Sequence, residues 1–380
     1  MTKKKSGGFA QWIQKVIYIG EYFDYPLLFV TLFLVAFGLV MVYSTSSYTA
    51  ELKMDNSAYY LIRQGIFALI GVAGMIGISL IDYRTWKKWS PIFMLAIIGL
   101  LALVLVMGET SHGAVRWIQI GPIQFQPSEV AKMVIALYTA HLCTIKAARI
   151  GDLKIIAKVM VLPIIAIILV AKENLSTGII CMAIAIIVVF VTSPKVKQFF
   201  VLGAVVVVVM AVFFLLGTSY RMERIDIWLN PEKYERGYQT LQSLYAIGSG
   251  GVFGKGLGQS IQKLGFIPES HNDYIFSVVC EELGLFGATC VIAMFMVLIY
   301  RCVIIAYNTK DLYGALVVVG ITTHIAVQVL INIAVVTNSL PPTGVPLPFI
   351  SYGGTSLFFL MIEIGIVLAV SRQLHVAKEY

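Results

Sequence analysis

Charged residues are scarce in this sequence, and their scarcity excludes a soluble globular domain. They make up 13% of the 380 residues, whereas hydrophobic residues make up 59%. Soluble domains carry roughly a quarter of their residues as charged side chains. The mean hydropathy is +0.87. Apolar sequence on this scale cannot be buried in one core, so we expect the chain to lie in lipid.

Acidic residues are fewer than basic ones, 20 against 28, which leaves a net charge of +8. A charge of this sign can indicate a nucleic-acid partner. Here, however, the basic residues occur in short clusters between apolar runs, as expected for a membrane-topology signal. We therefore predict no nucleic-acid partner.

Cysteine is also rare, and no pair of cysteines has the spacing of metal ligands. All five lie in or beside apolar stretches, so we interpret them as free buried thiols. They are Cys143, Cys181, Cys280, Cys290 and Cys302.

Two further signals are missing. No small-residue cleavage site follows the first apolar run at 28–42, so we expect no removed signal peptide. The glycine-dense stretch at 248–258 is irregular and has no preceding strand, which argues against a Rossmann or P-loop motif. No internal repeat stands out either. One membrane domain with a loop insertion is the simplest organisation.

What the sequence does contain is a series of apolar runs near the ~20 residues needed to cross a bilayer. They predict an all-α polytopic membrane protein with about ten transmembrane helices. The eighth run is too long for one crossing and begins with Asp273, Glu281 and Glu282, so its lipid-spanning part should be about 283–305. The runs lie at 25–45, 60–82, 90–108, 128–148, 155–172, 177–194, 198–217, 272–307, 312–336 and 349–371.

Lysine and arginine concentrate in the N-terminal arm, the tail and the even-numbered connections. Positive residues mark the cytoplasmic side, so we predict that both termini are cytoplasmic. One large extracellular loop, 218–271, then lies between helices 7 and 8. We divide the chain into a cytoplasmic arm at 1–24, a single membrane domain at 25–372 and a cytoplasmic tail at 373–380.

Ionisable groups at a membrane span are costly, so they mark candidate functional sites. The first set begins the fourth run, in Gln126-Pro127-Ser128-Glu129-Val-Ala-Lys132. Pro127 suits a first helical turn and makes Gln126 extended, which places Ser128 and Glu129 at the positive end of the helix dipole. Glu129 and Lys132 are three apart and can pair. A purely structural ion pair is the alternative to a functional role.

Just before this helix, Arg116 and Trp117 suit an interfacial segment that contacts phosphate and lipid headgroups. An aromatic anchor without a functional role is the alternative.

The second set lies where the long loop enters the eighth run. It contains Lys263, His271 and Asp273, and Glu281 follows two helical turns after Asp273 on the same broad side. Acidic groups that continue into an apolar span indicate a polar cavity. The alternative is that Asp273 is only a helix cap.

The third set is the connection at 338–356, with four prolines and three glycines. Irregular backbone at membrane depth is tolerated only where protein or water covers it. Upstream, Gln328 and Asn332 are four residues apart on one helix face and would line that space. A plain tight hairpin is the alternative.

Three such clusters on the outer side suit a lipid-linked anionic substrate. Arg116, Lys132, Lys255 and Lys263 would neutralise phosphate, and Asp273 would remove a proton from an attacking hydroxyl. Sugar transfer from a lipid diphosphate needs these two elements. A transporter for the lipid-linked headgroup would use the same residues, and the residues alone do not separate the two.

At these clusters the chain closely resembles the SEDS family (shape, elongation, division and sporulation). The resemblance rests on five stretches jointly, with the ten-helix layout between them. They are Arg116-Trp-Ile with Phe125-Gln-Pro-Ser-Glu-Val-Ala-Lys132, Gly250-Gly-Val-Phe-Gly-Lys-Gly-Leu-Gly258, Ile267-Pro-Glu-Ser-His-Asn-Asp-Tyr-Ile-Phe276, Glu281-Glu-Leu-Gly284 and Pro346-Leu-Pro-Phe-Ile-Ser-Tyr-Gly-Gly-Thr-Ser356.

The resemblance implies a peptidoglycan glycosyltransferase that polymerises lipid II on the outer face of the bacterial cytoplasmic membrane and releases undecaprenyl diphosphate. It implies Asp273 as the catalytic residue and a single-pass class B penicillin-binding protein as the partner, beside other division or elongation membrane proteins. No ligand cluster demands a metal, but a divalent cation, Mg or Mn, bridging the diphosphate would suit this chemistry. The candidate substrate-binding residues are Arg116, Trp117, Gln126, Ser128, Glu129, Lys132, Lys263, His271, Glu281, Ser351, Gly353 and Gly354.

Within the family, the motifs are more similar to the FtsW/SpoVE-like group than to the RodA-like, elongation-type polymerases. One departure stands out: many members carry an aspartate at the start of the sixth run, where this chain has Asn174 after Glu173. A lipid II flippase and a scaffold for a division or elongation complex remain the alternative functions.

Overall fold

The computed structural model describes residues 23–107, 109–111, 114–120, 123–195, 199, 203, 226–234, 237–268 and 270–374. Within these ranges, nine helices are long and apolar enough to cross a membrane. They confirm nine of the ten predicted spans. The nine are α2 (Tyr25–Met54), α3 (Tyr59–Ser79), α4 (Arg84–Met107), α5 (Pro127–Lys146), α6 (Leu153–Glu173), α7 (Leu175–Thr192), α11 (Ile275–Asn308), α12 (Leu312–Val336) and α13 (Gly354–Ser371).

The seventh predicted span, 198–217, lies outside the described residues except for two isolated positions. The same holds for most of the arm at 1–24, most of the tail at 373–380 and the first part of the long loop. In the rest of that loop, a short 3-10 helix η2 (Pro231–Lys233) precedes α10 (Tyr238–Gly250).

A small sheet, absent from the all-α prediction, lies between α4 and α5. It has three antiparallel strands in the order β1-β2-β3, namely β1 (Glu109–Ser111), β2 (Ala114–Ile120) and β3 (Ile123–Phe125). In β2, β-branched and aromatic residues such as Val115, Trp117 and Ile118 favour extended backbone. The strands are too short for a periodicity signal to stand out against the long apolar runs around them.

Small residues allow the closest helix contacts. Gly71 and Gly365 lie where α3 packs along α13, and a Cβ added to Gly365 would lie 2.7 Å from the carbonyl oxygen of Met75. Between α12 and α5, a Cβ on Gly320 would lie 2.8 Å from the Cβ of Ala136. Helices in lipid associate through such close backbone approach rather than through a hydrophobic driving force.

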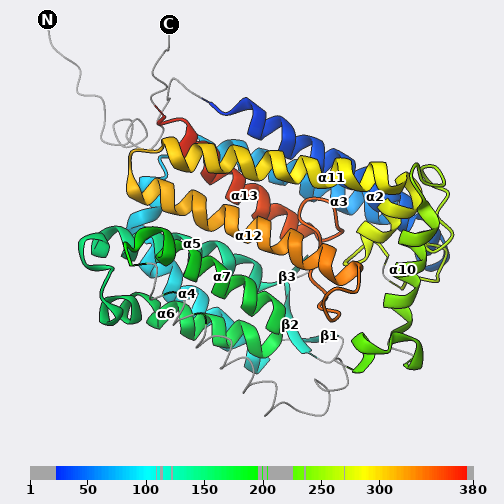
Figure 1. Ribbon diagram of the computed structural model, residues 1–380, viewed down its shortest axis with the longest axis horizontal. Helices are drawn as coiled ribbons and strands as arrows, with labels where there is room; N and C mark the ends of the chain where they lie inside the picture. Colours follow the sequence, from blue (N-terminus) through cyan, green and yellow to red (C-terminus); the bar gives the residue numbers. More distant parts are fainter. Residues whose placement is uncertain are drawn as a thin grey trace, which may run out of the picture.

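The helix ends alternate between two ends of the bundle. At one end, on the left in Figure 1, α2 begins and α13 ends, and the Asp24 carboxylate pairs with the Arg301 guanidinium at 2.6 Å. At the opposite end lie the sheet and α10 (Figure 1). We call these the inner and outer ends, after the orientation that the charges predict. That the inner end is cytoplasmic stays a prediction.

Candidate active site

Helix α11 is broken near the outer end, and the break is made by Gly284. Its φ of 67° and ψ of −166° interrupt the helix, which separates Ile275 and the acidic residues from the longer apolar part. A left-handed φ of this kind favours glycine because it carries no Cβ. The position agrees with the expected start of the lipid-spanning part at about 283.

The glycine-dense stretch of the long loop supplies the hydrogen bonds that this break removes. The N–H groups of Lys255 and Gly256 donate to the carbonyls of Glu281 and Glu282, each at 2.9 Å. In return, the N–H groups of Leu285 and Phe286 donate to the carbonyls of Gly251 and Val252. Because unpaired backbone groups are costly at membrane depth, the loop and the broken helix form one unit.

The acidic side chains of this helix secure the same loop. The Glu281 carboxylate pairs with the Lys255 ammonium at 2.7 Å and accepts a hydrogen bond from the Ser260 hydroxyl. Neither Glu281 nor Glu282 has exposed surface.

Glu282 pairs with the Lys263 ammonium at 2.8 Å and accepts from the Ser44 hydroxyl at 2.7 Å. Lys263 is buried. Both lysines that we expected to neutralise phosphate here, Lys255 and Lys263, are thus paired with carboxylates in this structure, and any contact of Lys263 with substrate stays a prediction.

Asp273 lies two residues before α11 begins and is half-buried. The N-cap position of α11 is Tyr274 rather than Asp273, and the Tyr274 side chain makes no capping hydrogen bond. The Asn332 amide donates to the Asp273 carbonyl at 2.8 Å and also to the carbonyl of Val345. A Cβ added to Gly344 would lie 3.8 Å from Oδ2 of Asp273. The carboxylate therefore faces the proline-rich connection.

His271 joins the same connection through its backbone and its ring. Its carbonyl accepts from the Tyr352 N–H at 2.9 Å. Its imidazole ring lies 4.5 Å from the ring of Tyr60 and 5.5 Å from that of Tyr352, measured between centroids. Burial raises the pKa of the Tyr352 phenol, an effect that the nearby Arg63 partly opposes.

Ser351, Gly353 and Gly354 shape the end of the proline-rich connection. The Ser351 hydroxyl accepts from the Leu347 N–H at 2.8 Å. The Gln64 amide donates to the Ser351 carbonyl and accepts from the Gly353 N–H. Gly354 begins α13. No helix or strand occurs between α12 and α13, which confirms the predicted irregular backbone.

At the start of α5, Gln126 is extended and Pro127 occupies the first turn, as predicted. The Lys132 ammonium pairs with the Glu129 carboxylate at 2.9 Å. The Ser356 hydroxyl donates to Glu129 at 2.6 Å, and Lys132 donates to Oε1 of Gln328 at 2.9 Å.

These groups are covered in the structure. Glu129 and Lys132 are 6% and 2% exposed, and Ser128 is also buried. Gln126 remains half-buried.

Arg116 and Trp117 lie in β2. Trp117 is half-buried and stands opposite Glu109 of β1 in the strand register. The side chain of Arg116 lies outside the described part of the structure.

The structure therefore brings together the start of α11, the connection before α13 and the start of α5. Residues of the cluster that the sequence did not single out are Tyr60, Gln64, Tyr352 and Ser356. The signal for Gln64 was present: it is an uncharged polar residue within an apolar run, 1% exposed in the structure, where a polar side chain needs a partner.

The departure at Asn174 has a local explanation. Its side chain accepts from the N–H groups of Ser176 and Thr177 and caps α7. Asparagine serves an N-cap as well as aspartate does, so this site keeps its helix-capping geometry without the charge.

In the described ranges, no three histidine, cysteine, aspartate or glutamate side chains gather as metal ligands.

Comparison with known proteins identifies the family of this chain. A model of the FtsW/RodA/SpoVE family, described as cell cycle proteins, matches residues 25–376. The chain belongs to this family. It is a multi-pass protein of the bacterial cytoplasmic membrane.

Among curated relatives, stage V sporulation protein E of Bacillus subtilis is 39% identical over 92% of this chain and 97% of its own length. A protein of Trichlorobacter lovleyi named "Probable peptidoglycan glycosyltransferase FtsW" is 38% identical over 96% of this chain and 97% of its own. These relatives support the FtsW/SpoVE-like group that the motifs indicate.

Among solved structures, a chain of a peptidoglycan synthase complex that coordinates polymerization and crosslinking superposes with a TM-score of 0.78. It is 27% identical and the match covers 93% of this chain and 98% of that one. The rod shape determining protein RodA of Thermus thermophilus gives a TM-score of 0.70 at 25% identity, covering 94% and 99% of the two chains.

Proposed function

We propose that this protein is a peptidoglycan glycosyltransferase that polymerises lipid II at the outer face of the membrane. The relatives named as peptidoglycan glycosyltransferases support the activity, and the placement of Asp273 supports a mechanism. Its carboxylate lies at the end of the loop, faces the proline-rich connection, and is carried by backbone that Asn332 holds from α12.

In the proposed reaction, the Asp273 carboxylate accepts the proton of the acceptor sugar hydroxyl. The hydroxyl oxygen then bonds to the anomeric carbon of the donor, and the bond from that carbon to the diphosphate oxygen breaks. Undecaprenyl diphosphate leaves with the bonding electron pair. A base within hydrogen-bond reach typically contributes 10²–10⁴-fold to such a step.

An apolar groove between α4, α5 and α13 suits the polyprenyl tail. Its volume is about 310 Å³, and Val130 and Met133 line it beside the positions of Glu129 and Lys132. From there it continues along the helices to Trp86 near the inner end. The groove thus extends along the bundle from the first turns of α5, which also carry Glu129 and Lys132, as a lipid tail with its headgroup at the outer end requires.

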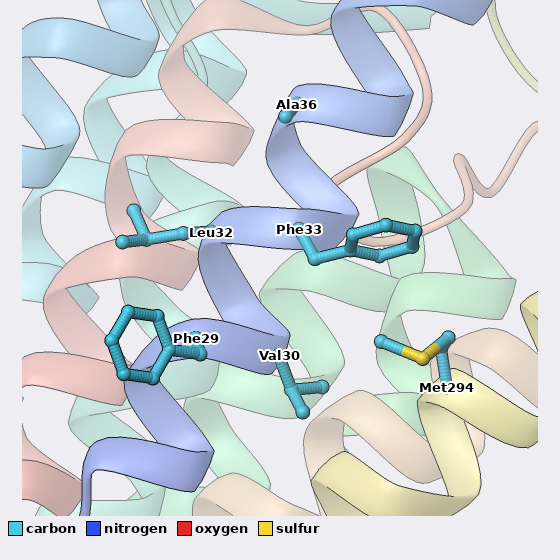
Figure 2. A pocket seen from close by; sticks show the side chains of 6 residues that line it. All are labelled: Phe29, Val30, Leu32, Phe33, Ala36 and Met294. Atoms are coloured by element: carbon cyan, nitrogen blue, oxygen red, sulfur yellow. The ribbon is translucent and has the colours of Figure 1, made fainter.

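A second groove is less suited to this substrate. It lies between α2 and α11, where Phe29, Phe33 and Met294 line it with three neighbours (Figure 2). All six side chains are apolar, and none is beside a polar residue of the candidate active site in the sequence.

For partners, we propose a class B penicillin-binding protein, other division membrane proteins and lipid II itself. The support is the likeness to a chain of a peptidoglycan synthase complex. A Mg or Mn ion, where the reaction uses one, would be held chiefly by the substrate diphosphate.

The test is polymerisation of labelled lipid II by the purified full-length protein with its partner. The parent should make long glycan strands and Asp273→Asn should make them at least about 100-fold more slowly, because the base is lost. Asp55→Asn is the matched control, since Asp55 is an exposed carboxylate after α2 in a left-handed conformation that asparagine tolerates.

Normal polymerisation by Asp273→Asn would refute the assignment of the base. Lipid II translocation in sealed vesicles that survives this substitution, without polymerisation by the parent, would support a flippase instead.

A further inference from the structure

A chain of buried polar groups leads from the candidate active site into the middle of the bundle. It starts at the Glu129–Lys132 pair and passes through Gln328, whose Oε1 lies 2.9 Å from Nε2 of His324. Nδ1 of His324 lies 2.7 Å from Oε2 of Glu363. His324 and Glu363 are 2% and 1% exposed, and each is near the midpoint of its helix, α12 or α13.

The orientation of the Gln328 amide follows from its other partners. Nε2 of Gln328 donates to the Pro346 carbonyl at 3.0 Å, and a carbonyl can only accept. Lys132 can only donate. Oε1 of Gln328 therefore faces both Lys132 and His324, so Nε2 of His324 must carry a hydrogen to donate to it.

The second ring nitrogen then requires another proton. If His324 were neutral with its hydrogen on Nε2, the bare Nδ1 would face a carboxylate oxygen at 2.7 Å, which places two acceptors against each other. Either Nδ1 also carries a hydrogen or Glu363 is protonated and donates to Nδ1. In both cases the pair holds one proton more than a neutral imidazole and a carboxylate.

Charge balance agrees with this count. With the shared proton, Glu129, Lys132, His324 and Glu363 sum to zero, whereas without it they would leave one net negative charge buried. An uncompensated buried charge is strongly destabilising. A further titratable group near the cluster, among the described residues, is the Cys181 thiol of α7, which interacts electrostatically with Lys132, Glu129 and Glu363.

We propose that His324 and Glu363 are positioning residues of the outer site, and that the proton they share fixes the site through Gln328. This proposal rests on the proposed function for its kinetic consequence. His324, Gln328 and Asn332 follow one another at four-residue intervals along one face of α12. Gln328 holds Lys132 and the Pro346 carbonyl, and Asn332 holds the carbonyls of Val345 and Asp273.

Two variants test whether His324 and Glu363 position Gln328 through their shared proton or only fill space in the bundle. His324→Leu/Glu363→Leu removes the pair without leaving a buried charge. Glu363→Gln keeps the hydrogen bonds without the proton, because the new amide can donate to Nδ1 while Nε2 still donates to Gln328. Thr323→Val is the matched control on α12, since the Thr323 hydroxyl only bonds the Val319 carbonyl of its own helix.

We expect the double leucine variant to keep its melting temperature within a few degrees and to lose about tenfold in kcat on lipid II, with a smaller change in KM. Glu363→Gln should retain most of the parent kcat.

A double leucine variant with parental kcat and KM would overturn the proposal. So would a Glu363→Gln protein as impaired as the double leucine variant. If the parent itself fails to polymerise lipid II, the proposed function is wrong, but the proposal about His324 and Glu363 can still be tested. Ring ¹⁵N resonances of His324 and the infrared band of the Glu363 acid report the shared proton directly. If neither signal shows this proton, the proposal for the pair is wrong.

Discussion

Lys132 carries its charge inside the bundle, where 2% of its surface is exposed and the Glu129 carboxylate lies 2.9 Å from its ammonium. Removing one member of a buried pair leaves the other without compensation and costs about 3–5 kcal/mol. Lys132→Met should therefore lower the melting temperature strongly, and Glu129→Gln/Lys132→Met should restore most of it. Thermal unfolding in detergent measures both.

Polymerisation by the restored double variant then separates structure from function at these two positions. If Lys132 contacts the substrate diphosphate, the stable double variant should still lose about tenfold or more in kcat/KM, since a charge-assisted hydrogen bond contributes about 1.5–3 kcal/mol. Parental activity in the double variant would contradict the substrate role.

At this scale the sequence predicts some pairs and misses others for a plain reason. The Glu129–Lys132 pair follows from a spacing of three along one helix. The partners of Lys263 do not, because Ser44 is 219 residues away in the sequence and Glu282 meets Lys263 only once the loop has folded back. Local periodicity carries no information about such contacts.

Among the elements, the loop and the break in α11 approach each other closely at two facing glycines, Gly254 and Gly284. Gly254 has a φ of +78°, and a Cβ there would lie 2.2 Å from the Glu282 carbonyl oxygen. Gly258 has a similar φ of +80° but open space around it. Each Gly→Ala change costs about 1–2 kcal/mol in backbone strain, and only Gly254→Ala adds a steric clash.

Gly254→Ala should therefore lower the melting temperature and the polymerisation rate well beyond Gly258→Ala. Equal effects of the two substitutions would show that the loop does not need this close approach to the helix.

The sequence predicted most helices but not all of the elements that lie beside them. Apolar runs of sufficient length predicted the nine described spans, and the limit that the acidic residues set on the lipid-spanning part of the eighth stays a prediction. The sheet after α4 was missed, since seven residues of β2 between an apolar run and a proline provide little pattern. The glycine-dense stretch was recognised as irregular, but its role depends on Gly284, which lies in another segment.

For the molecule as a whole, the groove between α4, α5 and α13 predicts how the lipid tail is recognised. Ala96 lines this groove, whereas Leu95 is 60% exposed on the same helix and does not line it. Ala96→Trp should fill the groove and raise KM for lipid II about tenfold, and Leu95→Trp should leave it unchanged. Kinetics with long-chain and short-chain lipid II measure this.

The effect of Ala96→Trp should be smaller for the short-chain substrate. An equal rise in KM for both chain lengths would show that the substitution acts on the headgroup site rather than on the tail.

The sequence alone predicted that three distant clusters would meet at one end of the bundle. They meet there through hydrogen bonds of Asn332, Gln328 and Tyr352. That prediction was possible because costly polar residues in lipid must find one another. No single apolar run of the sequence predicts that α3 packs along α13. Nor does one predict the groove that helix packing leaves open.

The repaired break in α11 also bears on how the protein is made. Residues 248–263 precede α11 in the chain, so they are synthesised first and, in the orientation that the charges predict, are exported. Their contacts with Glu281, Glu282 and the open backbone at Gly284 can form only when α11 follows. In that orientation, we expect docking of the exported loop to complete the insertion of α11.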